Sequence, residues 1–196
     1  RFRGTSPLRS LDLARGISLY DESRGLPQAY ALTRWRGVVH VASGRGLYRL
    51  NAGGDSGGAR FERVLPVLRN TNALATVDGD TLLVANGGIE THPDYGREML
   101  NLDSMQPSLA LIERRTGELR GLAALPAEVS RLSIRHLAVD AAGGAWFGGQ
   151  WHGDALAPPP AMGRLDRDGR LALAEWPDEL IRTAAGYIGA LAASRD

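Results

Sequence analysis

One recurring pattern constrains this chain more than any other feature: two short apolar segments flank a tight turn and end near a pair of glycines. The pattern occurs three times, in stretches that begin at Ala29, Asn72 and Ile134. Each segment has the length and the β-branched or aromatic content of a strand. The turns, at 36–37, 78–80 and 141–144, contain the glycine or Asp-Gly that a hairpin requires. The repeats therefore predict β-hairpins.

The spacing of the repeats is typical of a β-propeller. Val38 and Thr81, which begin the second strand of the first two copies, lie 43 residues apart. Thr81 and Ala145 lie 64 residues apart, and the excess is an insertion at 88–107. A period of about 40–50 residues with four strands per unit is the signature of propeller blades. Two further apolar segments follow the second and third hairpins and supply the remaining strands of each unit.

We therefore predict one all-β domain of propeller type over residues 1–196. Three full four-stranded blades are expected at 29–69, 71–126 and 131–178, with a partial blade at 1–26 and the start of another at 187–196. The end pieces lack a second strand, so the chain is expected to be an excerpt of a larger ring. A short helical turn is expected within 177–186.

Composition excludes several kinds of chemistry. The chain contains no cysteine, and all 23 of its basic residues are arginine. Disulfide frameworks, thiolate zinc sites, Schiff-base lysines and P-loops are therefore excluded. A net charge of +1 without an arginine stripe predicts no nucleic-acid binding. No apolar run reaches the roughly 18 residues that a membrane-spanning helix needs.

Propeller geometry predicts where a binding site would lie. In each blade the innermost strand begins at the top face, and the loop between the second and third strands returns to that face. The insertion 88–107 and the segment 151–160 are such loops, and Arg135 and His136 lie near the start of an innermost strand. We expect a site for a protein partner or a small ligand there. Its candidate residues are His92, Asp94, Arg97, Asn101, Arg135, His136 and Trp151.

Three interpretations of these residues stay open at this point. Imidazole and carboxylate groups suit a divalent ion of iron, zinc or manganese as cofactor. Paired arginines suit the carboxylate or phosphate of an organic ligand, on which Trp151 would stack. Alternatively, the loop 91–97 folds on itself and His136 is a core residue. The metal ligands would be His92, Asp94, His136 and His152.

A long motif in the second half resembles a known family. Residues 84–113 read VANGGIETHPDYGREMLNLDSMQPSLALIE, and together with 132–140 and 187–194 they resemble the bacterial domain-of-unknown-function family 1513. The resemblance covers residues 79–193. It implies a propeller fold, export to the periplasm by the twin-arginine route, a link to iron acquisition and no established enzymatic activity.

The first 75 residues resemble a different family. Residues 16–32 and 38–50 are similar to the propeller repeat of two-component regulators, with its "GLP" motif and its glycine-leucine-aromatic-arginine motif. This second resemblance implies a sensor module.

The leading prediction is a non-enzymatic periplasmic propeller that binds a ligand or serves as a scaffold, linked to bacterial iron acquisition. One alternative is the propeller sensor domain of a two-component regulator. A further alternative is a metal-dependent propeller lactonase or lyase. Unpaired edge strands invite association, so an oligomer is a further expectation.

Overall fold

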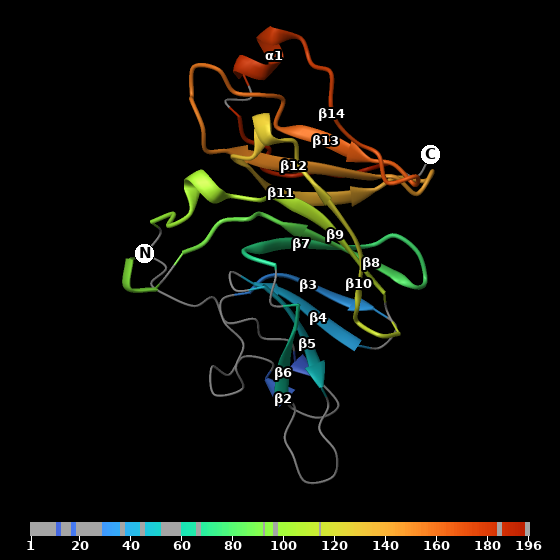
Figure 1. Ribbon diagram of the computed structural model, residues 1–196. Helices are drawn as coiled ribbons and strands as arrows, with labels where there is room; N and C mark the ends of the chain where they lie inside the picture. The colour runs from blue at the N-terminus through green and yellow to red at the C-terminus, as the bar shows by residue number, and fades with distance from the viewer. Residues whose placement is uncertain are drawn as a thin grey trace.

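The computed structural model describes residues 11–12, 17–18, 29–35, 38–43, 46–51, 60–65, 68–91, 93–95, 98–113, 115–183 and 186–194. These residues form an all-β structure with little helix (Figure 1). β1 (Leu11–Asp12) and β2 (Ile17–Ser18) make a two-stranded antiparallel pair. This pair falls inside the partial unit predicted at 1–26, most of which lies outside the described residues.

Three four-stranded antiparallel sheets account for most of the structure, and each joins its strands in chain order. The first sheet contains β3 (Ala29–Trp35), β4 (Val38–Ser43), β5 (Gly46–Asn51) and β6 (Arg60–Leu65). The second contains β7 (Thr71–Thr76), β8 (Thr81–Asn86), β9 (Ser108–Glu113) and β10 (Leu119–Ala124). The third contains β11 (Leu132–Val139), β12 (Ala145–Trp151), β13 (Met162–Leu165) and β14 (Leu171–Leu173).

The helical segments are short. The 3-10 turns η2 (Pro93–Tyr95) and η3 (Leu102–Ser104) lie in the insertion between β8 and β9, and η4 (Ala127–Val129) precedes β11. One α-helix, α1 (Asp178–Thr183), follows β14 and confirms the helical turn predicted there. None of the helices in the described part of the chain is long and apolar enough to cross a membrane.

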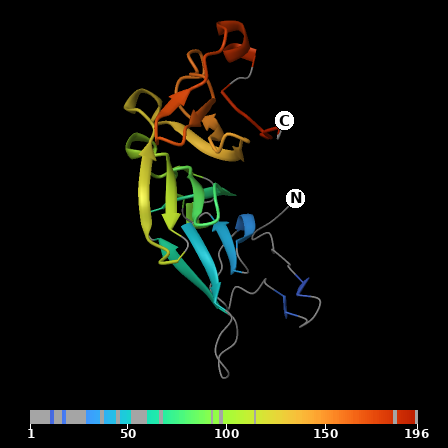
Figure 2. The same cartoon turned by 90° about the vertical axis from the view of Figure 1, so that its right-hand side faces the viewer.

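The second sheet lies between the other two (Figure 2), and its strand β8 packs against both of them, whereas β10 at the outer edge is largely exposed. All six residues of β8 are buried. Successive side chains of a strand point to opposite faces. Leu83 and Ala85 accordingly pack in a core shared with the third sheet, whereas Leu82 and Val84 pack in a core shared with the first. The unbroken apolar run of β8 in the sequence thus reflects two neighbouring sheets.

The first strands of the three sheets lie beside one another, β3 next to β7 and β7 next to β11. Two consecutive polar residues of β7 connect the sheets. The buried Thr71 hydroxyl donates to Gly46 O at 2.7 Å and accepts the Ser43 N–H at 3.0 Å. Asn72 Nδ2 donates to Ile134 O at 2.8 Å. Thr71 thus contacts the first sheet and Asn72 the third, at a register shift in the pairing of β7 with β8.

The C-terminal segment differs from the expectation. The start of another blade, and so its innermost strand, is predicted at 187–196, but the described residues 186–194 contain only an isolated bridge between Gln150 and Tyr187. Two backbone hydrogen bonds flank this bridge, Trp151 N–H to Gly186 O at 2.7 Å and Ile188 N–H to Gly149 O at 2.9 Å. The segment therefore pairs with the end of β12 at one point and does not continue as a strand.

Candidate functional site

The insertion between β8 and β9, residues 87–107, borders a cleft together with the segments that lead into β7 and β11. The cleft has a volume of about 740 Å³, within the range of small-ligand sites. We call it the insertion cleft. Its walls combine apolar and polar side chains. Among them are Leu68, Met105, Leu122 and Leu125, and also Arg69, Asn86, Glu90, Asn101, Ser104 and Gln106.

Asn86, the last residue of β8, fixes both ends of the insertion. Its Oδ1 accepts the N–H of Arg69 at 2.7 Å, just before β7. Its Nδ2 donates to Gln106 O at 3.2 Å and to Ser108 Oγ at 2.9 Å. Asn86 is almost fully buried, and these bonds satisfy its amide in a place where an unpaired polar group would be costly.

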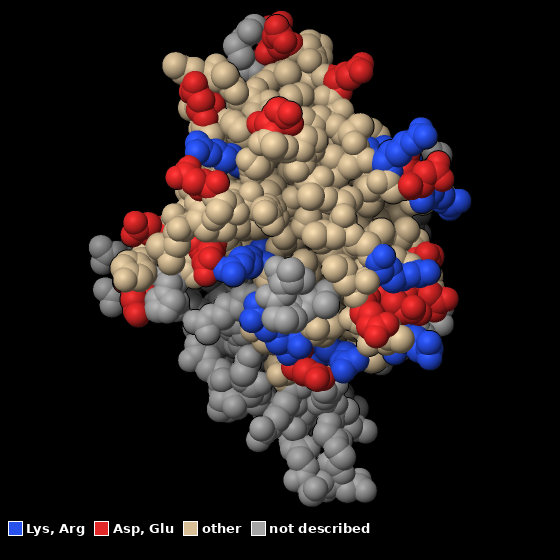
Figure 3. All heavy atoms as spheres, in the orientation of Figure 1, with Lys and Arg blue, Asp and Glu red and all other residues tan. Residues whose placement is uncertain are grey.

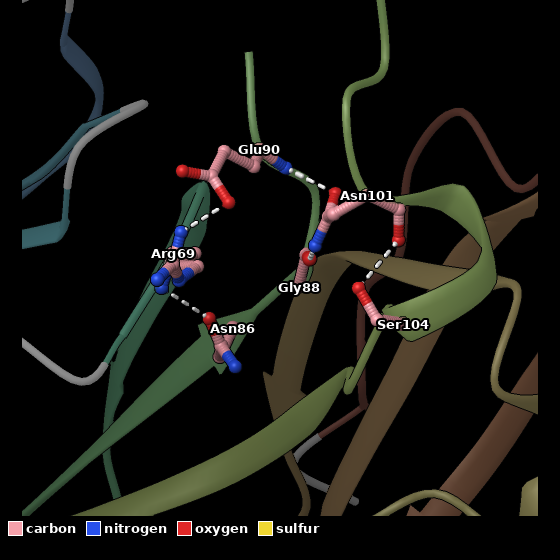
Figure 4. Close-up of polar contacts among 6 residues, drawn as sticks. All are labelled: Arg69, Asn86, Gly88, Glu90, Asn101 and Ser104. Carbon is pink, nitrogen blue, oxygen red and sulfur yellow. Dashed lines mark hydrogen bonds and ion pairs between the residues drawn. The ribbon is translucent and has the colours of Figure 1, made fainter.

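Asn101 performs the same role inside the insertion (Figure 4). Its Oδ1 accepts the Glu90 N–H at 2.7 Å, and its Nδ2 donates to Gly88 O at 2.8 Å. Gly88 has a φ of +72°, and a Cβ at this position would lie 2.7 Å from Pro107 N, so the close approach of the two ends requires glycine. The structure thus places the predicted ligand-binding residue Asn101 in a bracing position between the two halves of the loop.

Two ion pairs lie at the rim of the insertion cleft. Arg69 pairs with Glu90, and Arg131 Nη2 lies 2.6 Å from Asp103 Oδ1. All four side chains are substantially exposed, so the pairs contribute little to stability. Such exposed charges are available to rearrange around a bound ligand.

A second polar group surrounds Arg135 in β11. A register shift in the pairing of β11 with β12 falls between Ile134 and His136, and Arg135 lies at this bulge. Its Nη1 donates to Asn72 Oδ1 at 3.2 Å, and its Nη2 donates to Gln150 Oε1 at 3.3 Å. Arg135 is thereby held between β7 and the end of β12.

The positive charge of Arg135 affects the pKa of both His136 and His152. Burial first, and the positive charge of Arg135 second, lower the pKa of each histidine below 6.5. Both imidazoles are therefore mainly uncharged at neutral pH. The Nε2 atom of each is buried and has no hydrogen-bond partner among the residues that the structure describes. The structure thus brings three predicted site residues, Arg135, His136 and His152, into one electrostatic neighbourhood.

Asp94, His92, Arg97 and Trp151 are the remaining predicted site residues. Asp94 is exposed in η2, while His92 and Arg97 lie outside the described residues. Trp151 was expected in a loop but is the last residue of β12, and its indole N–H donates to Asp154 O at 2.8 Å. Among the described residues, no group of three or more histidine, aspartate or glutamate side chains is placed to hold a metal ion.

Several residues of the insertion cleft, such as Arg69 and Glu90, are not among the site residues that the sequence predicts. Arg69 and Glu90 are 21 positions apart and meet only because Asn86 joins the segment before β7 to the insertion. The available signal is the run Asn86-Gly87-Gly88, which places an amide directly before two residues without side chains.

Comparisons with known proteins relate the chain to a family and to a solved structure, both of unknown function. The family model of DUF1513, described as a protein of unknown function, matches residues 71–196. A search of the curated proteins finds no match. A crystal structure of a protein of unknown function from Bacteroides caccae is similar, with 12% sequence identity and a TM-score of 0.48. The match covers 76% of this chain and 51% of that one, so the chain spans about half its length.

Proposed function

The chain belongs to the DUF1513 family, and from this premise we propose that it is a non-enzymatic binding protein of β-propeller architecture whose ligand or partner docks in the insertion cleft. The propeller proposal is supported by three properties of the sheets. Each sheet joins four strands in chain order, the sheets pack face to face, and their first strands lie side by side. Propeller blades share these properties.

One observation carries the binding proposal: the insertion cleft is braced from within by two asparagines. The amide of Asn86 bonds the backbone of Arg69 and Gln106, and the amide of Asn101 bonds the backbone of Gly88 and Glu90. The walls of the cleft are therefore held in place before any ligand binds. Preorganisation of this kind lowers the entropic cost of binding. The mixed lining favours an amphipathic occupant, either a small organic molecule or a short segment of a protein partner.

The periplasmic location and the link to iron acquisition are part of the same proposal, and their support is the resemblance carried by residues 84–113. Cell fractionation of a native host tests the location. Growth of a deletion strain under iron limitation tests the link. Normal growth of that strain would contradict a role in iron acquisition.

The two alternatives stay predictions. A metal-dependent lactonase or lyase draws on His92, Asp94, His136 and His152, of which His92 lies outside the described residues. The sensor interpretation rests on residues 16–32 and 38–50, and the described residues include only part of them.

The insertion cleft is tested by a ligand screen with a matched pair of variants on β10. Leu122 lines the cleft and is 48% exposed, whereas Leu119 is 39% exposed on the same strand but does not line it. A fragment and peptide library is screened by NMR for shifts of the Asn101 and Ser104 amides. We expect Leu122→Arg to weaken binding of each hit at least tenfold and Leu119→Arg to leave it unchanged. Hits that respond equally to both variants, or an absence of hits at these amides, would refute the proposal.

A further inference from the structure

The turns β7–β8 and β11–β12 lie at the edge of the sheets opposite the insertion (Figure 1). A second cavity lies at this edge. It has a volume of about 350 Å³ and lies beside the turns β7–β8, β11–β12 and β13–β14. We call it the turn-edge cavity. The strand β8 separates it from the insertion cleft, because Thr81 at one end lines the cavity and Asn86 at the other lines the cleft. Five steps along a strand span roughly 17 Å, so the two are separate sites.

The floor of the turn-edge cavity is apolar. Leu83, Ala145 and Leu165 line it, and all three belong to the core between the second and third sheets. Val77 and Leu111 add further apolar surface and are only partly buried. The cavity therefore lies against the edge of this core, and an apolar group placed there would be removed from water.

Two arginines come from different sheets to the walls of this cavity, Arg120 from β10 and Arg167 from the β13–β14 turn. Arg120 Nη1 donates to Thr81 Oγ1 at 3.1 Å, which uses one of its five N–H groups. Arg167 makes no hydrogen bond or ion pair within the described part of the chain. Its guanidinium lies against Gly143, where a Cβ would come within 2.8 Å of Cζ. Glycine at 143 thus makes room for the guanidinium at the rim.

The two acidic residues that line the cavity, Asp78 and Asp166, each accept backbone N–H groups of the turn in which they lie. Asp78 Oδ1 accepts the N–H groups of Asp80 and Thr81, both at 2.7 Å. Asp166 Oδ1 accepts the N–H groups of Asp168 at 3.0 Å and Arg170 at 2.8 Å. On the face shown in Figure 3, arginines and acids alternate along this edge while the middle of the molecule carries little charge. Each carboxylate keeps its negative charge and its second oxygen, and the charge of Arg120 acts on Asp78. Of the two arginines that line the cavity, Arg167 is therefore the one whose charge is not already paired within the described residues.

We propose that the turn-edge cavity binds an apolar monocarboxylate, whose alkyl or aryl body lies on the apolar floor and whose carboxylate pairs with Arg167. Arginine binds carboxylates through two parallel N–H···O bonds, which gives this group its selectivity. Arg120 on the other wall adds a second positive charge, which the carboxylate of Asp78 partly offsets. The site is independent of the insertion cleft and of any ligand bound there.

The test uses three probes of one shape that differ in charge: 4-phenylbutyrate, its neutral amide 4-phenylbutyramide, and the cation 4-phenylbutylamine. Each is titrated into the full chain by calorimetry. We expect the carboxylate to bind at least tenfold more tightly than the other two. Arg167→Gln should weaken its binding at least tenfold. Arg170→Gln makes the same change of charge in the same turn, outside the cavity lining, and should leave binding unchanged.

Three outcomes would overturn the proposal: no binding of the carboxylate, equal binding of the amide or the amine, or equal effects of Arg167→Gln and Arg170→Gln. Leu122→Arg, which alters only the insertion cleft, should leave carboxylate binding intact. Loss of carboxylate binding in Leu122→Arg would show that the probe binds in the insertion cleft, and this result would also refute the proposal.

Discussion

Single amide side chains connect parts of this chain that are distant in sequence, and Asn72 is the clearest case. It donates to Ile134 O and accepts from Arg135, and so joins the second sheet to the third. Asn72→Ala leaves both partners short of a hydrogen bond. We expect the free energy of unfolding to fall by about 2–3 kcal/mol, measured by urea denaturation. Thr76→Ala, at the exposed end of the same strand, should change it by less than about 0.5 kcal/mol. Equal losses would contradict the role of Asn72.

Asn101 should control the order of the insertion more than the stability of the whole. Asn101→Ala removes the bonds to Glu90 N–H and Gly88 O. We expect a loss of about 1 kcal/mol and faster hydrogen exchange at the Glu90 amide, which NMR can follow. Ser104→Ala is the control, because that hydroxyl makes only a long bond of 3.4 Å to Asn101 O. Unchanged exchange at Glu90 in Asn101→Ala would show that the amide does not brace the loop.

His136 and His152 should make the free energy of unfolding depend on pH in the mildly acidic range. Burial and Arg135 lower both pKa values below the 6.5 of the unfolded chain. Below pH 6.5 the unfolded state therefore binds protons that the folded state does not, and stability falls as the pH is lowered. We expect the double variant His136→Gln/His152→Gln to lose less stability between pH 7.5 and 5.5 than the original chain, measured by urea denaturation. Equal losses would exclude these two groups as the source.

At the scale of an element, the glycine pair after β8 is a packing requirement. A Cβ on Gly87 would lie 2.5 Å from Asn72 Nδ2 and 2.6 Å from Ser133 Oγ. We expect Gly87→Ala to destabilise the fold by about 1–3 kcal/mol through overpacking. Gly121→Ala is the matched control, because its nearest neighbour, Leu111 Cδ1, is 3.8 Å away. The melting temperature should fall in Gly87→Ala and stay unchanged in Gly121→Ala. An unchanged melting temperature in Gly87→Ala would show that the contact at Gly87 is not tight.

The sequence predicted the elements better than the site, for a physical reason. Strand periodicity and glycine turns are local signals, and they located the hairpins of all three sheets. The insertion cleft depends on contacts such as Asn86 with Arg69 and Asn101 with Gly88, which only the folded chain brings together. Trp151 illustrates the limit. Its place at the end of β12 depends on the pairing with Leu132, which local sequence does not reveal.

At the scale of the whole molecule, the two cores on either side of the second sheet join the three sheets. Leu83 faces the third sheet and Leu82 the first, so each outer sheet buries one of its apolar faces against the second. Such sharing couples the sheets energetically, because unfolding one exposes the core of its neighbour. The described sheets should therefore unfold together and not one by one.

Phe147 offers the sharpest test of this coupling, because it is fully buried in the core that the second and third sheets share. We expect Phe147→Ala to lower the free energy of unfolding by about 3–5 kcal/mol. Far-UV circular dichroism reports all sheets. In a Trp35→Phe background, used for every chain compared, tryptophan fluorescence comes from Trp146 and Trp151 in the third sheet and from Trp176, which follows it. The two transitions should coincide in the original chain and in the variant. Leu156→Ala, at a side chain that is 92% exposed, is the control and should leave the midpoint unchanged. If the fluorescence transition came first in Phe147→Ala, the third sheet would be an independent unit and the shared core would not couple the sheets.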